Sequence, residues 1–212
     1  MPINLLFPPR CAGCRAEGAS CCARCLAAFG APRRVDVPGK GPPVFALADY
    51  RGPGGALVLA LKERGRRDLV PVFGALVAAA VPKLPRRYPG EFREWRLVPV
   101  PSRRAAARRR GGSHLVGIVR RAGLPVACAL AFGPGVADSV GLGAAARRAN
   151  LAGRVRLVPG GLPPPGAAVV LLDDVVTTGA TASACVSALK IGGFRVPAVL
   201  TLTTARRTHP HE

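Results

Sequence analysis

The feature that most constrains the fold of this chain is an apolar run that ends in two adjacent acids. Residues 169–172 read VVLL, which predicts a fully buried strand. Asp173 and Asp174 follow directly, in a chain of 212 residues that has only 11 acidic residues. Because acids are so scarce here, a pair of them at the end of a buried strand points to a function.

The loop after these acids has the chemistry of an anion site. It contains Thr177, Thr178, Gly179 and Thr181, and a helix through residues 184–189 is expected after it. Exposed N–H groups at the start of a helix bind anions, and carboxylates accept hydrogen bonds from ribose hydroxyls. The combination suits a sugar phosphate. The alternative is an ordinary strand-to-helix turn with N-capping threonines, which does not need paired acids.

Four cysteines near the N-terminus have the spacing of a metal site. Cys11, Cys14, Cys22 and Cys25 form two CxxC pairs separated by seven residues, so that two tight turns can present four thiolates to a tetrahedral zinc ion. Cys21 is either spare or a substitute ligand. The alternatives are free thiols, disulfides or a redox pair, and the two prolines before the first cysteine argue against the strand that a thioredoxin-like pair needs. We expect structural zinc.

The segment LLDDVVTTGAT resembles the phosphoribosyl pyrophosphate (PRPP) motif of type I phosphoribosyltransferases. The resemblance implies that Asp173 and Asp174 form the catalytic pair and contact the ribose hydroxyls, while residues 177–181 bind the 5′-phosphate. It also implies that Mg²⁺ accompanies PRPP. The PRPP-binding set is then Asp173, Asp174, Val175, Val176, Thr177, Thr178, Gly179, Ala180 and Thr181.

Other segments resemble the ComF family, competence protein F and its relatives, in which a zinc knuckle precedes a phosphoribosyltransferase-like domain. They are LVPVPSRRAAARRRGGSH, SVGLGAAARRANLAG and ALVLALKERGRRDLV. The second maps a family Arg and Asn onto Arg147 and Asn150, and the third carries Lys62. The first segment departs from the family pattern RGFN followed by Gln, because Gly112, Ser113 and His114 stand where Phe, Asn and Gln are usual. In the second, Ser139 stands where Gln is usual. A lone histidine at a helix start is more often structural than catalytic, so His114 is not among the expected catalytic residues.

The loop after residues 97–100 is the best candidate for the pyrophosphate end of PRPP. Phosphoribosyl transfer breaks the bond between ribose C1 and pyrophosphate, so cationic groups and Mg²⁺ must stabilise a highly charged leaving group. The residues expected to do this are Pro101, Ser102, Arg103, Arg104 and Lys62. Equally, the arginines of residues 103–110 could form a solvated or nucleic-acid-binding face.

The chain is strongly basic, with a formal net charge of +20, and 27 of its 31 basic residues are arginine. No acid lies between Glu94 and Asp138, where arginines cluster. Such clustering favours a polyanionic partner, although a bias of the genome toward arginine explains it equally well. Three functions follow: a phosphoribosyltransferase with an unidentified acceptor, a competence-type protein that assists uptake or processing of single-stranded DNA, or a PRPP sensor without turnover.

Hydrophobic patterning predicts an α/β fold. Strands are expected at residues 45–50, 97–100, 126–132, 155–158, 169–172 and 198–203, and helices at 54–64, 68–81 and 114–122. Alternating strands and helices predict a mostly parallel sheet flanked by helices, of the type I phosphoribosyltransferase kind that the resemblance implies. Ligands of such sheets bind beyond the carboxyl ends of the strands.

Composition divides the chain into four segments. Residues 1–30 are expected to form the four-cysteine zinc-binding knuckle, 31–43 a linker rich in Pro and Gly, 44–205 the phosphoribosyltransferase-like domain and 206–212 a disordered tail. Cys128 and Cys185 have apolar neighbours and are expected to be small core residues. Residues 4–7 are too short for a signal peptide and no membrane span is expected, so we predict a cytoplasmic location. Nothing in the sequence indicates the oligomeric state.

Overall fold

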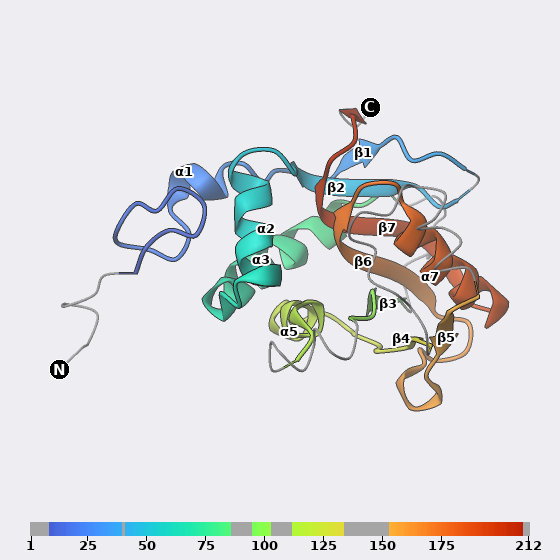
Figure 1. The fold of residues 1–212 in the computed structure, drawn as a ribbon. Coiled ribbons are helices and arrows are strands. Elements are labelled where there is room, and N and C mark those ends of the chain that lie inside the picture. The colour runs from blue at the N-terminus through green and yellow to red at the C-terminus, as the bar shows by residue number, and fades with distance from the viewer. Residues whose placement is uncertain (1–8, 40, 86–94, 103–111, 134–152, 210–212) are drawn as a thin grey trace.

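The fold is a six-stranded sheet with helices on both faces (Figure 1). The computed structural model describes residues 9–39, 41–85, 95–102, 112–133 and 153–209. The strands of the sheet are β1 Arg33–Val35, β2 Val44–Asp49, β3 Trp95–Pro99, β6 Ala168–Val176, β7 Arg195–Thr204 and β8 Thr208–His209. Their order is β3-β6-β7-β2-β1-β8, and a second sheet pairs β4 Leu130–Phe132 with β5 Val155–Leu157.

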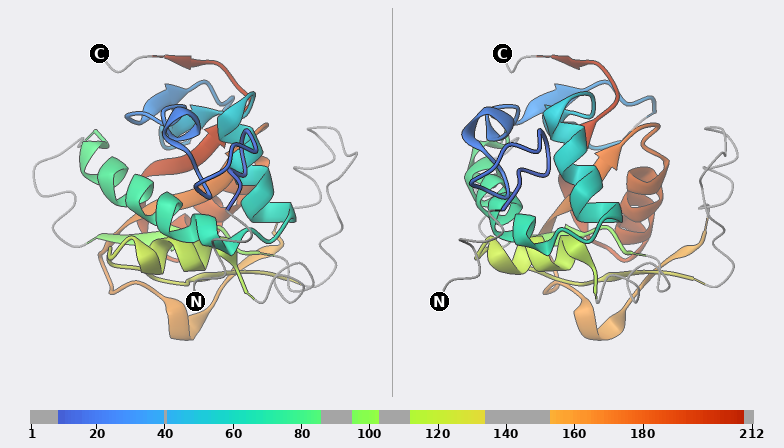
Figure 2. Two further views of the ribbon diagram at one scale, coloured as in Figure 1. Left: turned by 90° about the vertical axis from the view of Figure 1, so that its left-hand side faces the viewer. Right: turned by 60° about the vertical axis from the view of Figure 1, so that its left-hand side comes forward.

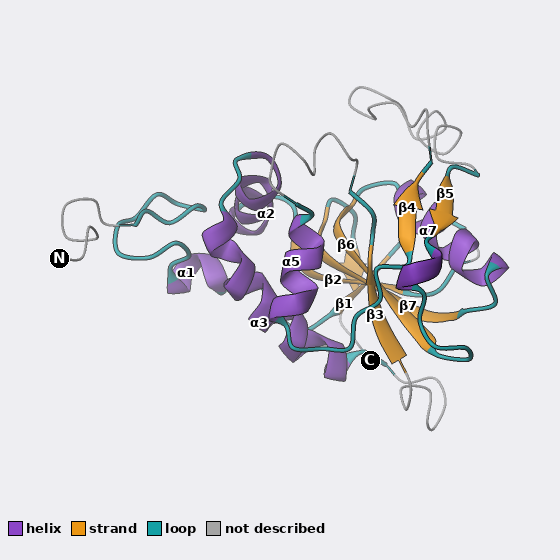
Figure 3. Cartoon of the chain, turned by 90° about the horizontal axis from the view of Figure 1, so that it is seen from below, coloured by secondary structure: helices purple, strands orange, loops and turns teal. Residues whose placement is uncertain are grey.

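Four neighbouring strands of the large sheet, β3, β6, β7 and β2, pair in parallel. At the edge, β1 pairs antiparallel with β2 and with β8. The helices are α1 Ala23–Leu26, α2 Pro53–Glu63, α3 Val70–Ala80, α5 His114–Arg121 and α7 Ala180–Ile191, with short 3-10 turns at Arg67–Leu69, Val81–Lys83 and Pro159–Gly161. Figures 1 and 3 show α2, α3 and α5 on one face of the sheet and α7 on the other. The prediction of a mostly parallel α/β sheet flanked by helices is confirmed.

The central strand β6 is longer than the sequence predicts. Residues 169–172 are completely buried, as expected for a strand covered on both faces. The strand then continues through both acids to Val176, because its pairing with β7 continues: Asp173 lies opposite Thr201, and Val176 opposite Thr204. The acids therefore lie inside the strand, and the expectation that it ends at residue 172 is wrong.

Two segments expected outside the domain contribute strands to the sheet. The predicted linker, residues 31–43, contains β1, and the predicted tail, residues 206–212, contains β8. Each is short and gains its order from a partner that lies far away in the sequence, as in the pairing of Arg34 with His209. Another expectation also fails, since Cys128 is exposed, whereas Cys185 is buried as predicted. The predicted strand at 126–132 is reduced to β4 and an isolated bridge between Val126 and Leu97.

The start of α2 packs tightly against the end of β2, and this contact requires glycine. A Cβ atom at Gly55 would overlap the carbonyl oxygen of Tyr50. Pro53 lies in the first turn of α2, where its missing N–H costs nothing. Lys62 lies in the last turn and is thereby carried over the sheet toward β6.

Within the ranges that the structure describes, no helix is both long and apolar enough to cross a membrane.

Candidate functional site

The connection from β6 to α7 forms a tight loop at the carboxyl end of a central parallel strand. Gly179 precedes the first residue of α7 with a left-handed φ of 78°, a conformation that favours glycine. A Cβ atom at this position would also overlap the side chain of Val37. The Ala180 N–H donates to Thr178 Oγ1 at 3.3 Å. The predicted loop of residues 177–181 therefore follows a central strand and leads into a helix, at the edge where α/β sheets bind ligands.

Arg206 connects this loop to the segment after β1, at the antiparallel edge of the sheet, by hydrogen bonds. Its Nη1 donates to the carbonyl oxygen of Thr177 at 3.3 Å, and its Nε donates to the carbonyl oxygen of Asp36. The sequence analysis placed Arg206 in a disordered tail and missed this contact. Its position just after a strand that pairs with β6 is the signal that could have identified it.

Asp174 is buried and paired with two side chains from the helices that cover one face. Asp174 is only 6% exposed. Lys62 Nζ lies 3.2 Å from Oδ1 and 3.0 Å from Oδ2, and His114 Nε2 lies 3.0 Å from Oδ2. Asp174 does not stand at an exposed strand end, because the strand continues to Val176 and α2 and α5 contribute its partners.

Asp173 lies beside Asp174 but has different surroundings. Successive side chains of a strand point to opposite faces, and the charge of Asp173 acts on Cys185 of α7, on the other side of the sheet. Its Oδ1 accepts the backbone N–H of Asp174 at 2.8 Å. The residue is 5% exposed.

The two acids consequently differ in their readiness to ionise. Burial, and next the charge of Asp174, raise the pKa of Asp173 to about 7, against the opposing charge of Lys62. Burial also opposes ionisation of Asp174, but the hydrogen bond with His114 and the charge of Lys62 outweigh it and hold the pKa of Asp174 well below its usual range. Around neutral pH the pair therefore combines one fixed anion with one acid that exchanges its proton.

Three of the residues expected at the pyrophosphate end lie in the described part of the chain. Lys62 contacts Asp174. Pro101 and Ser102 follow β3, the parallel neighbour of β6, so they lie at the same sheet edge as the phosphate loop. Ser102 Oγ donates to Ser113 Oγ at 2.9 Å. The other residues named from the sequence motifs, Arg103, Arg104, Ser139, Arg147 and Asn150, fall outside the described part of the chain.

His114 is the site residue that the sequence analysis set aside. Ser113 caps α5 by accepting the Val116 N–H, and the first helical residue, His114, then faces the sheet. It is 8% exposed. One sequence signal could have pointed to it: His114 is a polar residue on the apolar face of its helix, which follows the loop after a central strand. The sequence does not show that its partner is Asp174 on β6.

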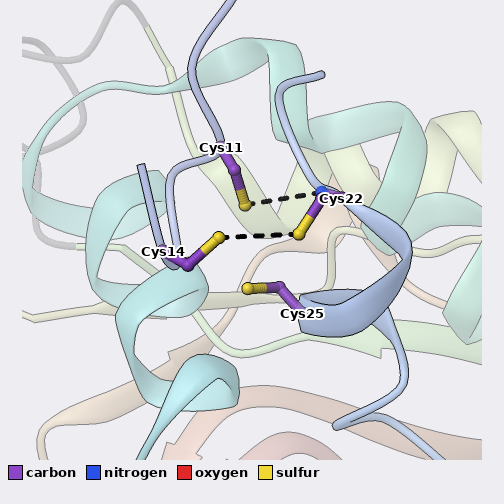
Figure 4. A group of neighbouring side chains, drawn as sticks. All are labelled: Cys11, Cys14, Cys22 and Cys25. Atoms are coloured by element: carbon purple, nitrogen blue, oxygen red, sulfur yellow. Dashed lines mark hydrogen bonds between the residues drawn. The ribbon is translucent and has the colours of Figure 1, made fainter. Parts of the chain in front are cut away.

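The four cysteines of the N-terminal segment converge on one point (Figure 4). The Sγ atoms of Cys11, Cys14, Cys22 and Cys25 all lie within 4.8 Å of one another, and those of Cys14 and Cys22 are 3.6 Å apart. A tetrahedral site with Zn–S bonds of about 2.3 Å needs sulfurs about 3.8 Å apart. The group could hold a metal ion such as zinc. Cys21 lies outside it, which leaves Cys22 as the ligand.

Backbone hydrogen bonds favour the thiolate forms of Cys11 and Cys14 by lowering their pKa values. Burial disfavours the ionised form of Cys11, but hydrogen bonds from the backbone of Cys22, Cys14 and Gly13 lower its pKa to about 6. The Cys22 N–H donates to Cys11 Sγ at 3.4 Å. Such N–H groups orient metal-binding thiolates and stabilise their charge.

No protein-family model matches the chain, and no curated protein matches it.

Proposed function

We propose that this chain is a ComF-like protein with a type I phosphoribosyltransferase-like fold that binds PRPP together with Mg²⁺. The observation that carries the proposal is the arrangement at the end of β6. Two buried acids, Asp173 and Asp174, lie near the end of β6, two residues before a loop that turns at a left-handed Gly179 into the start of α7. An ordinary capped turn requires the loop alone; the acids supply acceptors for hydroxyl groups beside an anion site.

Each part of PRPP has a counterpart in this arrangement. The 5′-phosphate would accept hydrogen bonds from the N–H groups of residues 177–181 and from the threonine hydroxyls. The ribose hydroxyls would donate to Asp173 and Asp174. Carboxylates and phosphate oxygens are the ligands that Mg²⁺ prefers; the two acids would help to hold it, and it would offset the charge of the departing pyrophosphate.

The reaction proposed for this site is transfer of phosphoribose, with cleavage of the bond between ribose C1 and pyrophosphate. The loop after β3 begins with Pro101 and Ser102 at the same sheet edge, and its arginines, Arg103 and Arg104, would stabilise the leaving group. The chain would act by positioning and electrostatics, without a covalent nucleophile. No residue identifies the acceptor, and a PRPP sensor without turnover would use the same pocket.

The proposal is tested by calorimetric titration of PRPP with Mg²⁺ into the wild-type chain. Asp173→Asn removes one proposed ribose acceptor, while Asp68→Asn removes an exposed acid whose partner is Arg66, outside the site. We expect wild type and Asp68→Asn to bind PRPP alike and Asp173→Asn to bind it at least tenfold more weakly, the loss of about 1.4 kcal/mol. Absence of binding by the wild type would refute the proposal. DNA affinity that falls steeply with salt would then favour the basic surface as the functional site.

A further inference from the structure

Three side chains from three separate elements meet at the Asp174 carboxylate. Lys62 comes from the last turn of α2 and lies 112 positions away in the sequence, and His114 comes from the first turn of α5, 60 positions away. Both contact one buried acid with distances of 3.0 to 3.2 Å. Charge-assisted contacts of this length restrict the orientation of a carboxylate.

We propose that Lys62 and His114 are positioning residues, which fix the Asp174 carboxylate so that it accepts a ribose hydroxyl. The inference rests on the PRPP site proposed above and assigns this acid a specific role within it. Neither residue touches the ribose in this role. They act through Asp174.

The Asp174 carboxylate keeps acceptor capacity in this arrangement. A carboxylate has about four lone-pair sites, two on each oxygen. Lys62 Nζ donates to Oδ1 at 3.2 Å, and His114 Nε2 lies 3.0 Å from Oδ2. Among the described residues, these two contacts leave one site on each oxygen for a ribose hydroxyl. The Lys62 side chain is 38% exposed, so the cluster is not sealed from solvent.

The geometry also fixes the hydrogen of His114. Its Nδ1 is buried and has no hydrogen-bond partner among the described residues. A buried N–H without an acceptor is costly, so the proton of the neutral ring belongs on Nε2, where it is donated to Asp174. The carboxylate is then held by an oriented donor from α5 and a flexible ammonium from α2.

The first test examines the free protein and does not depend on any ligand. The chain has three histidines, so their ring nitrogens can be resolved by NMR after ¹⁵N-histidine labelling. We expect the Nε2–H tautomer for His114, with its Nε2 signal shifted in Asp174→Asn. A ring that exchanges between tautomers, or that carries its proton on Nδ1, would overturn the inference whether or not the chain binds PRPP.

The second test compares ligands with and without the hydroxyls. His114→Leu removes the donor, His114→Gln replaces it with a neutral amide donor, and Lys62→Met is matched by Lys83→Met at an exposed lysine outside the site. We expect His114→Leu and Lys62→Met to bind ribose 5-phosphate about tenfold more weakly. His114→Gln should stay within about threefold of wild type, and Lys83→Met should equal it. The affinity of His114→Leu for inorganic pyrophosphate, which has no ribose, should not change.

Folding of each variant is checked by circular dichroism. If His114→Leu does not fold, the ribose 5-phosphate affinity of His114→Gln is compared with that of wild type instead. Equal affinities of wild type and folded variants for ribose 5-phosphate would overturn the inference while leaving the PRPP site in place. So would equal losses in His114→Gln and His114→Leu, because the role would then not be hydrogen-bond donation. If the wild type binds PRPP but not ribose 5-phosphate, the affinities of the same variants are compared with PRPP as the ligand.

Discussion

Asp174 and its two partners, Lys62 and His114, form a cluster whose disruption should destabilise the chain. The substitution Asp174→Asn leaves Lys62 without its nearest counter-charge and His114 with a weaker acceptor. We expect the free energy of unfolding to fall by about 1–3 kcal/mol, as for a buried polar group that loses its partner. The matched control is Asp68→Asn, whose ion pair with Arg66 lies at the surface and contributes less than about 1 kcal/mol. Urea denaturation at pH 7 measures both, and equal effects would contradict the burial of Asp174.

Asp173 should behave in the opposite way, because no cationic side chain among the described residues forms an ion pair with it. Burial raises its pKa to about 7, whereas its pKa in an unfolded chain is about 4. Between these values the folded state holds a proton that the unfolded state has lost, so this group stabilises the fold at low pH and the contribution is lost as pH rises through about 7. Asn imitates the protonated acid and lacks this dependence.

The measurement is the difference in unfolding free energy between Asp173→Asn and wild type at pH 4.5, 6 and 7.5. We expect this difference to grow in favour of the variant as pH rises, since only the wild type must bury a charge there. A difference that stays constant with pH would show that Asp173 ionises normally in the folded chain.

At the scale of elements, the connection from β6 to α7 depends on glycine at one position. Gly179 has φ 78°, and a Cβ atom there would overlap Val37. Gly166, before β6, has the same φ, but a Cβ atom there meets nothing within 4 Å. Both alanine variants should lose about 1–2 kcal/mol from the left-handed backbone. Gly179→Ala should lose more and should also weaken PRPP binding, because its loop must move away from Val37.

Chemical denaturation and calorimetric titration separate these effects. Equal losses of stability in the two variants would mean that the Val37 side chain moves aside without lowering the free energy of unfolding. Unchanged PRPP affinity in Gly179→Ala would exclude the loop from the binding site.

The elements that could be predicted are those whose signals are local. The spacing of the four cysteines between Cys11 and Cys25 predicts a metal-binding group, because all four lie close together in the sequence. The apolar run 169–172 likewise predicts its own burial. The length of β6 depends on hydrogen bonds to β7, and β1 is a strand only because β2 and β8 lie beside it. The contact of His114 with Asp174 joins residues 60 positions apart, and no local pattern encodes that pairing.

At the scale of the whole molecule, the cysteine group and the acids are joined through α2. The N-terminal segment lies against α2 and α3 (Figure 2), and Phe29 packs edge-on against Phe73 of α3 with ring centroids 5.6 Å apart. A Cβ atom at Gly13 would lie 2.9 Å from Cys25 Sγ and 3.5 Å from Leu57 Cγ of α2. The same helix carries Lys62 to Asp174. Disruption of the cysteine group should therefore loosen α2 and act on the distant acid.

This coupling predicts that disrupting the cysteine group destabilises more than the N-terminal segment. Cys14→Ser, which removes one member of the group, should speed amide hydrogen exchange in residues 23–29 and also in α2, whereas Cys21→Ser, which changes a cysteine outside the group, should leave both unchanged. Each kcal/mol lost should lower Tm by about 2–4 °C in a chain of this size. A chelator added to wild type should reproduce the Cys14→Ser pattern. If exchange rises only before residue 30 and α2 stays protected, the cysteine group stabilises its own segment alone, and Lys62 is held by the rest of the domain.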